Sequence, residues 1–219
     1  MRKGTLYVFT GPSGAGKGTL LGLLREQDDK LFYSISATTR APRPGESDGV
    51  QYYFLTRADF EEKIAQNAFL EHARYVDNYY GTLEAPVNEK LAEGYDVILE
   101  IEVQGAMQVH EKRPDAVMVF IAPPSFEELA ARLRGRGTED EEKVHKRLET
   151  AKEELKHQDE FDYVVVNDEI DRAVREIQGI LAARRARGRG DRVEQPVVLL
   201  AQQAQQRALA RTGRAGEYI

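Results

Sequence analysis

A glycine-rich segment with the sequence TGPSGAGKGTL occupies residues 10–20. Gly11, Gly16 and Lys17 have the spacing G-x-x-x-x-G-K of a phosphate-binding loop. Glycine lets successive backbone N–H groups approach phosphate oxygens, and the positive end of a following helix acts at the same point. Lys17 adds a full charge on a flexible stem that can reach the β- and γ-phosphates. The pattern predicts binding of a nucleoside triphosphate, against the alternative of a glycine-rich turn with a surface lysine.

The segments on either side of the loop favour binding. Residues 5–10 are an apolar run that predicts a buried strand, and residues 19–27 carry leucines at helical spacing. A strand, a glycine-rich loop and a helix, in this order, are what a phosphate-binding loop requires. The predicted triphosphate site consists of Gly11, Pro12, Ser13, Gly14, Ala15, Gly16, Lys17, Gly18 and Thr19.

Gly18 departs from the usual pattern of such loops. A Ser or Thr normally stands at this position and offers its hydroxyl to Mg²⁺, whereas here the hydroxyl comes one residue later, at Thr19. We expect Mg²⁺ to accompany ATP as the cofactor, with Thr19 as a candidate ligand, and we expect the metal to be held differently from the usual way.

The rest of the chain indicates an α/β fold. Runs of apolar and β-branched residues predict buried strands at residues 96–102, 116–123 and 163–168, and helical patterns predict helices at 84–93, 103–112, 125–134, 139–156 and 169–187. Strands that alternate with helices around a phosphate loop predict a P-loop NTPase-type core, with a doubly wound parallel sheet flanked by helices. Residues 32–82 differ: three extended segments (32–46, 50–56 and 68–82) and a helix at 57–67 predict a strand-rich insertion.

Composition restricts the class of protein further. The chain has 219 residues, a net charge of -6 and no cysteine, which excludes disulfides and thiolate metal sites. No apolar stretch approaches the roughly 18 residues of a membrane span, so we expect a cytoplasmic protein without a membrane partner. The charge is uneven, because the segment from Leu181 onward carries +5. This basic tail could dock on the acidic body, on another subunit or on RNA, although nucleic acid is an unlikely partner because the tail lacks interleaved aromatic residues.

Two groups of arginines suggest anion sites. Arg40 and Arg43 lie on either side of a proline in the loop TTRAPRPGE, and a guanidinium fork matches phosphate oxygens in geometry and charge. The segment RLRGRGTEDEEKVHKRL includes a break flanked by glycines, which would permit a hinge, and the basic residues Arg132, Arg134, Arg136, Lys146 and Arg147 lie around it. The alternative for each group is a solvated basic surface.

Six separated motifs resemble guanylate kinases, in that family's order and at its spacing, over roughly residues 4 to 187. They are SISATTRAPRPGESDGVQYYF, FLEHARYVDNYYGT, LEIEVQG, IAPPS, RLRGRGTE and VVVND. The resemblance implies an enzyme that transfers the γ-phosphoryl group of ATP to GMP and gives ADP and GDP, with ATP and GMP as its small-molecule partners. It also implies a GMP site made of Ser36, Arg40, Arg43, Tyr52, Glu71, Tyr80, Thr82, Glu100 and Glu102.

The role that the resemblance gives to Glu71 agrees with the chemistry of guanine. Guanine presents two adjacent donors, N1–H and the exocyclic N2–H₂, and a single carboxylate accepts from both, whereas adenine has an acceptor at N1. A site built around such hydrogen bonds strongly rejects the analogue that cannot form them. Without the resemblance, Glu71 in FLEHA would be interpreted as an exposed strand residue.

The resemblance also assigns the donor side of the reaction. Lys17, Arg40, Arg132, Arg136 and Arg147 become the catalytic residues, Arg134 is left on the surface, and Asn167 is placed near the adenine of ATP. Many family members have aspartates where this chain has Glu100 and Glu102. We expect Glu100, with Thr19, to be a metal ligand, because Mg²⁺ keeps several waters through which a longer carboxylate can hold it.

The predicted organisation follows from these assignments. Residues 1–33 and 84–187 form the core, residues 34–83 the GMP-binding insertion, residues 135–155 approximately the lid, and residues 188–219 a basic appendage with a helical pattern. Two rival functions remain: another nucleoside monophosphate kinase, because GPSGAGKGT also resembles the loop of adenylate kinases, and a non-catalytic guanylate-kinase-like module that binds peptides. Glu71 argues against the first, and the complete loop and lid arginines argue against the second.

Overall fold

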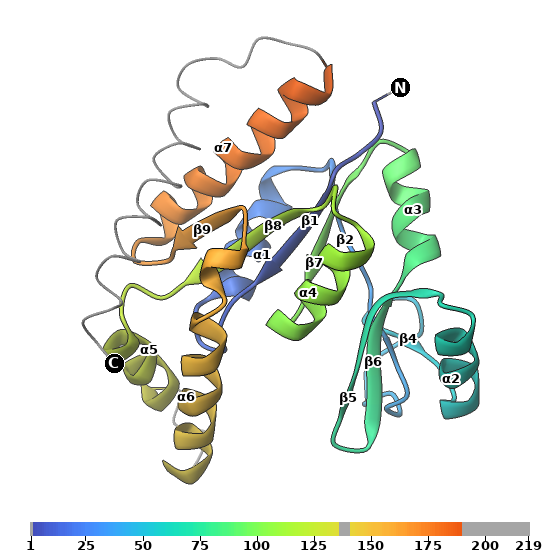
Figure 1. Cartoon of the computed structure of the whole chain (residues 1–219), viewed down its shortest axis with the longest axis horizontal. Helices are drawn as coiled ribbons and strands as arrows, with labels where there is room; N and C mark the ends of the chain where they lie inside the picture. The colour runs from blue at the N-terminus through green and yellow to red at the C-terminus, as the bar shows by residue number, and fades with distance from the viewer. Residues whose placement is uncertain (1, 136–140, 190–219) are drawn as a thin grey trace. The chain divides into compact units, whose positions relative to one another are not determined.

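The computed structural model of the chain describes residues 2–135 and 141–189 (Figure 1). The chain divides into two compact units: the first comprises Lys3–Val8 and Lys30–Ala116, and the second comprises Phe9–Asp29 and the residues from Val117 onward. No helix in the described part of the chain is long and apolar enough to cross a membrane. Residues 136–140 and 190–219 lie outside the described residues, and with them the beginning of the predicted lid and nearly all of the predicted appendage with its helical pattern.

The first unit contains the whole of the predicted insertion, residues 34–83, and part of the predicted core. Its elements are β2 (Leu31–Tyr33), β3 (Ala37–Thr38), β4 (Tyr53–Phe54), α2 (Arg57–Ala65), β5 (Phe69–Tyr75), β6 (Asn78–Leu83), α3 (Glu84–Ala92), β7 (Asp96–Glu100) and α4 (Val103–Lys112). The second unit contains α1 (Lys17–Gln27), β8 (Val117–Ala122), α5 (Phe126–Gly135), α6 (Glu141–Leu155), a short 3₁₀ turn (Gln158–Glu160), β9 (Tyr163–Val166) and α7 (Ile170–Arg189). Strand β1 (Leu6–Thr10) contributes residues to both.

The strands form two sheets. The larger has the order β2-β7-β1-β8-β9, and the β2–β7 and β8–β9 pairs are parallel. All residues of β1 and β8 are buried, which explains why these strands are continuous apolar runs. The strand order and the helices that follow the strands confirm the predicted α/β fold with a parallel sheet.

The smaller sheet has the order β4-β3-β6-β5 and lies wholly in the first unit. Helix α2 covers it (Figure 1): Phe60 of α2 stacks on Phe69 and Tyr79, with ring centroids 4.3 Å and 5.2 Å apart. Thr56 caps α2, because its hydroxyl accepts a hydrogen bond from the backbone N–H of Asp59 at 3.1 Å. Aromatic stacking thus fixes the sheet that carries Glu71 and Thr82.

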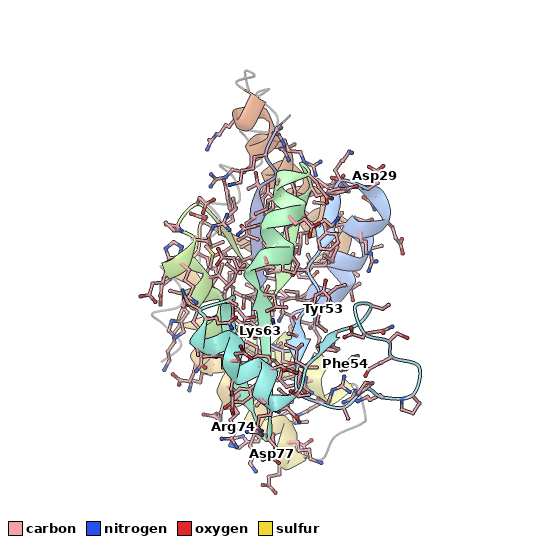
Figure 2. The ribbon with its side chains drawn as sticks, turned by 90° about the vertical axis from the view of Figure 1, so that its right-hand side faces the viewer. Asp29, Tyr53, Phe54, Lys63, Arg74 and Asp77 are labelled. Carbon is pink, nitrogen blue, oxygen red and sulfur yellow. The ribbon has the colours of Figure 1, made fainter. Side chains whose placement is uncertain are left out.

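Helix boundaries agree with the predicted ones within two residues, but the insertion differs in detail. The single extended segment expected at 68–82 is a hairpin of β5 and β6, and Figure 2 shows Asp77 at its tip. Of residues 50–56, only Tyr53 and Phe54 form a strand. The hairpin turns at Val76, which has a positive φ of 54°. The turn was not predicted because a β-branched residue rarely adopts this conformation.

Candidate functional site

The phosphate loop of the second unit has the backbone that its glycines allow. Gly11 and Gly16 have φ values of 137° and 89°, in the region that favours glycine. A Cβ at Gly11 would lie 2.1 Å from the carbonyl oxygen of Ile121, and one at Gly16 would lie 2.3 Å from Nδ2 of Asn167. Gly16 is also the N-cap of α1, so the loop leads directly into the N-terminus of this helix. The loop therefore has the form that binds phosphate.

Lys17 is the first residue of α1 and folds back over the loop. Its Nζ donates hydrogen bonds to the carbonyl oxygens of Gly11 and Pro12, the latter at 3.2 Å. These bonds hold the ammonium group against the loop, where the sequence predicts that phosphates bind. Gly18 and Thr19 follow in the first turn of α1, and both are exposed.

Asn167 holds the phosphate loop from the end of β9. Its Nδ2 donates a buried hydrogen bond of 2.7 Å to the carbonyl oxygen of Ala15, although 152 residues separate the two. Arg132 of α5 donates at 3.0 Å to the carbonyl oxygen of Asn167 and at 3.1 Å to Glu128. Asn167 thus links Arg132 to the phosphate loop by hydrogen bonds. The resemblance placed Asn167 near adenine, and the observed contact gives it a structural task that the sequence did not predict.

Helices α5 and α6 of the second unit pack on each other through an apolar cluster that includes Leu133 and Val144. Arg147 of α6, in the segment predicted as a lid, donates a hydrogen bond of 2.6 Å to Oγ of Ser13 in the phosphate loop. Arg134 is 55 % exposed and lies 3.7 Å from Glu141, as expected for a surface residue. Arg136 lies outside the described residues.

The predicted acceptor residues gather in the first unit. A pocket of about 180 Å³ is lined by four of them, together with six residues that the sequence did not predict. The predicted four are Ser36, Tyr52, Thr82 and Glu100; the others are Tyr33, Ser34, Gln51, Ile98, Leu99 and Ile101. The polar groups among them make the pocket suitable for a ligand with several hydrogen-bonding atoms.

Glu71 is buried in this unit, with only 6 % of its surface exposed. The interpretation from the residues alone, an exposed strand residue, is therefore wrong. Thr82 of the neighbouring strand donates from Oγ1 to Oε1 of Glu71 at 2.7 Å. Burial raises the pKa of Glu71 above its usual value, while the hydrogen bonds from Thr82 act in the opposite direction. A buried carboxylate with few partners in the protein can accept two donors from a ligand.

Three of the predicted acceptor residues, Arg40, Tyr52 and Tyr80, lie together in the first unit. The Arg40 guanidinium lies 5.3 Å from the centroid of the Tyr52 ring, and the rings of Tyr52 and Tyr80 meet edge to face at 6.2 Å. Glu46 accepts from Arg40 at 2.9 Å and from the backbone N–H of Arg43 at 2.7 Å, and this contact lowers the pKa of Glu46. A carboxylate thus already binds to the guanidinium that the resemblance assigns to a phosphate. The sequence analysis missed Glu46, although an acidic residue in a basic loop is a signal for such a pair.

Neither carboxylate that replaces an aspartate is buried. Glu100 ends β7 and Glu102 is the N-cap of α4, and both are exposed. The side chain of Glu102 makes no capping hydrogen bond to α4. Within the part of the chain that the structure describes, no group of three or more His, Asp or Glu side chains is placed to hold a metal ion.

Comparison with known proteins gives one family. The model for guanylate kinase matches residues 3–184 of the chain. A guanylate kinase of Hydrogenovibrio crunogenus is 53% identical over 182 residues, which cover 83% of this chain and 89% of that protein. One of Lactococcus lactis is 54% identical over 181 residues, which cover 83% and 88%. The crystal structure of guanylate kinase from Anaplasma phagocytophilum has a TM-score of 0.63 at 33% identity and covers 84% of this chain and 87% of that chain. The resemblance found in the six motifs is confirmed, and the chain belongs to the guanylate kinase family.

Proposed function

We propose that this chain is an ATP:GMP phosphotransferase, which moves the γ-phosphoryl group of ATP to GMP and gives ADP and GDP. The observation that carries the proposal is Glu71, a buried carboxylate beside Thr82 in a chain of the guanylate kinase family. An ionised Glu71 accepts from N1–H and N2–H₂ of guanine, while Ser36 and Thr82 contact the remaining base edge. Adenine would leave the carboxylate without its donors, which explains the choice of acceptor.

The phosphate of GMP binds in this proposal to Arg40, Arg43 and the phenol hydroxyls of Tyr52 and Tyr80. Arg40 is already positioned by its contacts with Tyr52 and Glu46. A phosphate ester is largely ionised near pH 7, so the attacking oxygen needs no strong general base. The GMP phosphate then replaces the Glu46 carboxylate as the partner of Arg40.

ATP binds along the phosphate loop, residues 11–19. Backbone N–H groups of the loop and the N-terminus of α1 hold the β- and γ-phosphates, and Lys17 balances their charge. The γ-phosphoryl group passes in line to the acceptor oxygen without a covalent intermediate, while Arg132, Arg136 and Arg147 stabilise the charge on the transferring group. Closure of the lid excludes water, which would otherwise compete as acceptor.

Mg²⁺ suits this chain as the companion of ATP. The hydroxyl of Thr19 and the carboxylate of Glu100 are hard oxygen donors, which Mg²⁺ prefers, and the ion commonly takes few protein ligands beside waters and phosphate oxygens. When bound, it neutralises charge on the β- and γ-phosphates. Its coordination here would depend more on water than in loops with a Ser or Thr after the lysine.

Steady-state kinetics of two substitutions test the assignment. Lys17→Ala is expected to lower kcat for GDP formation about 100-fold or more while calorimetry still detects GMP, because the lysine acts on the transferring phosphoryl group. Glu71→Gln is expected to raise the KM for GMP at least tenfold and leave the KM for ATP within twofold, because only base recognition changes. Loss of ATP affinity in Glu71→Gln, or full kcat in Lys17→Ala, would contradict the proposal.

A further inference from the structure

Helix α4 makes three contacts with strand β5 from one of its faces. Gly105, Gln108 and Lys112 are three and four residues apart, so they lie on the same side of the helix. Gln108 accepts from the backbone N–H of His72 at 3.1 Å and donates to its carbonyl oxygen at 3.2 Å. Lys112 donates at 2.7 Å to the carbonyl oxygen of Phe69 and at 3.0 Å to Asn67. These contacts lie on either side of Glu71 along the chain.

β5 needs such contacts because it is the last strand of its sheet. In the order β4-β3-β6-β5, β6 is its one neighbour among the described strands, so the backbone groups on its other side have no strand partner there. Gln108 satisfies both the backbone N–H and the backbone carbonyl oxygen of His72, in place of a neighbouring strand. Helix α4 therefore fixes the position of the β5 backbone at His72, the residue next to Glu71.

Gly105 lies directly against the Glu71 carboxyl group. A Cβ at position 105 would be 2.9 Å from Oε2 of Glu71 and 3.4 Å from its Cδ and Cγ. The first distance is too short for a real contact, and the atom in the way is the far end of a side chain. An alanine would therefore displace the carboxylate rather than the helix. The other oxygen, Oε1, is held by Thr82 at 2.7 Å, so displacement also strains that hydrogen bond.

From this arrangement we propose that Gly105 and Gln108 are positioning residues for guanine recognition, which set the place of the Glu71 carboxylate from the side opposite Thr82. The proposal rests on the function assigned above to Glu71. A carboxylate must meet N1–H and N2–H₂ at once, and a small displacement loses one of the two bonds. Gly105→Ala then weakens the binding of GMP more than the binding of IMP, because IMP lacks the 2-amino group and forms only one of these bonds.

The test compares binding of GMP and IMP by calorimetry in matched variants of the full chain. Gly105→Ala is expected to lower the affinity for GMP about tenfold, which corresponds to the loss of one good hydrogen bond. The affinity for IMP should fall by much less. Gln108→Ala is also expected to lower the ratio of the affinity for GMP to the affinity for IMP, called the GMP:IMP ratio below. The controls are Gly22→Ala, where a Cβ meets nothing within 4 Å, and Gln104→Ala on the exposed side of α4; both should keep the ratio.

Two further readouts separate positioning from folding and from the proposed function. With GMP as substrate, KM should rise in Gly105→Ala while kcat and the KM for ATP stay within about twofold. In the protein without nucleotide, the carboxyl-carbon NMR signal of Glu71, assigned by Glu71→Gln, should move in Gly105→Ala and stay in Gly22→Ala. Failure of the parent chain to bind GMP would overturn the proposed function and the role in guanine recognition that rests on it, whereas the Glu71 signal would still show whether Gly105 positions the carboxylate. An unchanged GMP:IMP ratio and an unmoved Glu71 signal in Gly105→Ala would overturn this inference alone. If Gly105→Ala does not fold, the GMP:IMP ratio of Gln108→Ala tests the inference, and an unchanged ratio in that variant would overturn it.

Discussion

The hydroxyl of Thr82 donates a 2.7 Å hydrogen bond to the carboxylate of Glu71, and both side chains are buried in the sheet of the first unit. This pair determines how recognition of GMP depends on pH. Burial raises the pKa of Glu71, and only the ionised form accepts both donors of guanine. The KM for GMP should therefore fall as pH rises through this raised pKa and then reach a plateau. Initial rates at several pH values, with saturating ATP, measure the change; a KM that rises over this range would contradict it.

Stability should change with pH in the opposite direction. The folded state binds the Glu71 proton more tightly than the unfolded state, in which the carboxyl has the ordinary pKa of a glutamic acid. The contribution is therefore complete below the unfolded pKa and is lost as pH rises through the folded pKa. Urea unfolding of the parent chain and of Glu71→Gln measures this directly. The difference in unfolding free energy should move in favour of Glu71→Gln as pH rises, and a constant difference would show that the carboxyl has no shifted pKa.

Asn167 should control the affinity for ATP through the phosphate loop. In Asn167→Ala the carbonyl oxygen of Ala15 loses its buried donor, and we expect the KM for ATP to rise about tenfold, or 1.4 kcal/mol. The KM for GMP should not change. Arg134→Ala is the control, because that side chain is mostly exposed. Equal ATP kinetics in Asn167→Ala and the control would show that the loop keeps its form without this hydrogen bond.

Gly18→Ser should reduce the requirement for Mg²⁺. A Cβ at Gly18 meets nothing within 4 Å, so the new hydroxyl fits without displacing other atoms. It would stand where phosphate-binding loops usually offer Ser or Thr to the metal. A titration of Mg²⁺ at fixed ATP should give half-maximal rate at a concentration several-fold lower than in the parent chain, as expected for one more oxygen ligand. A higher half-maximal concentration would mean that this chain holds the ion in another place.

Val76 destabilises the turn of the β5–β6 hairpin through a strained backbone conformation. It is β-branched, has a φ of 54° and is 74% exposed. Asn67, with a φ of 53°, shows the residue type that tolerates this conformation. Val76→Asn should raise the free energy of unfolding by roughly 1 kcal/mol. The control is Val50→Asn, which removes another exposed valine, one without a positive φ. An equal gain in both variants would attribute the effect to lost apolar surface rather than to backbone strain.

The phosphate loop and the core could be predicted because their signals are local. Gly11, Gly16 and Lys17 lie close together in the sequence, and buried strands such as β1 and β8 are continuous apolar runs. The hairpin turn at Val76 was missed because nothing in YVDN matches the glycine or asparagine pairs that signal a tight turn. Local propensity gave no warning there, and pairing of β5 with β6 overrides it.

Contacts between residues far apart in the chain show what a single sequence does not reveal. The burial of Glu71 depends on β6 and α4, and the hydrogen bond between Asn167 and Ala15 joins residues far apart in the chain. Glu46 binds Arg40 across a loop without periodicity, so the acidic residue in a basic loop indicates that a pair forms but does not identify the partner. The roles proposed for Glu71, Arg40 and the lid arginines came from the resemblance.

Acceptor choice tests the central claim most directly. Purified chain, ATP and Mg²⁺ are offered GMP, AMP, UMP and dTMP separately, and formation of ADP is followed. The account predicts turnover with GMP and rates lower by at least about 10⁴-fold with the other three, the discrimination expected when the hydrogen-bonding groups of a site are left unpaired. Comparable turnover with AMP, or measurable GMP binding without turnover on any acceptor, would contradict it.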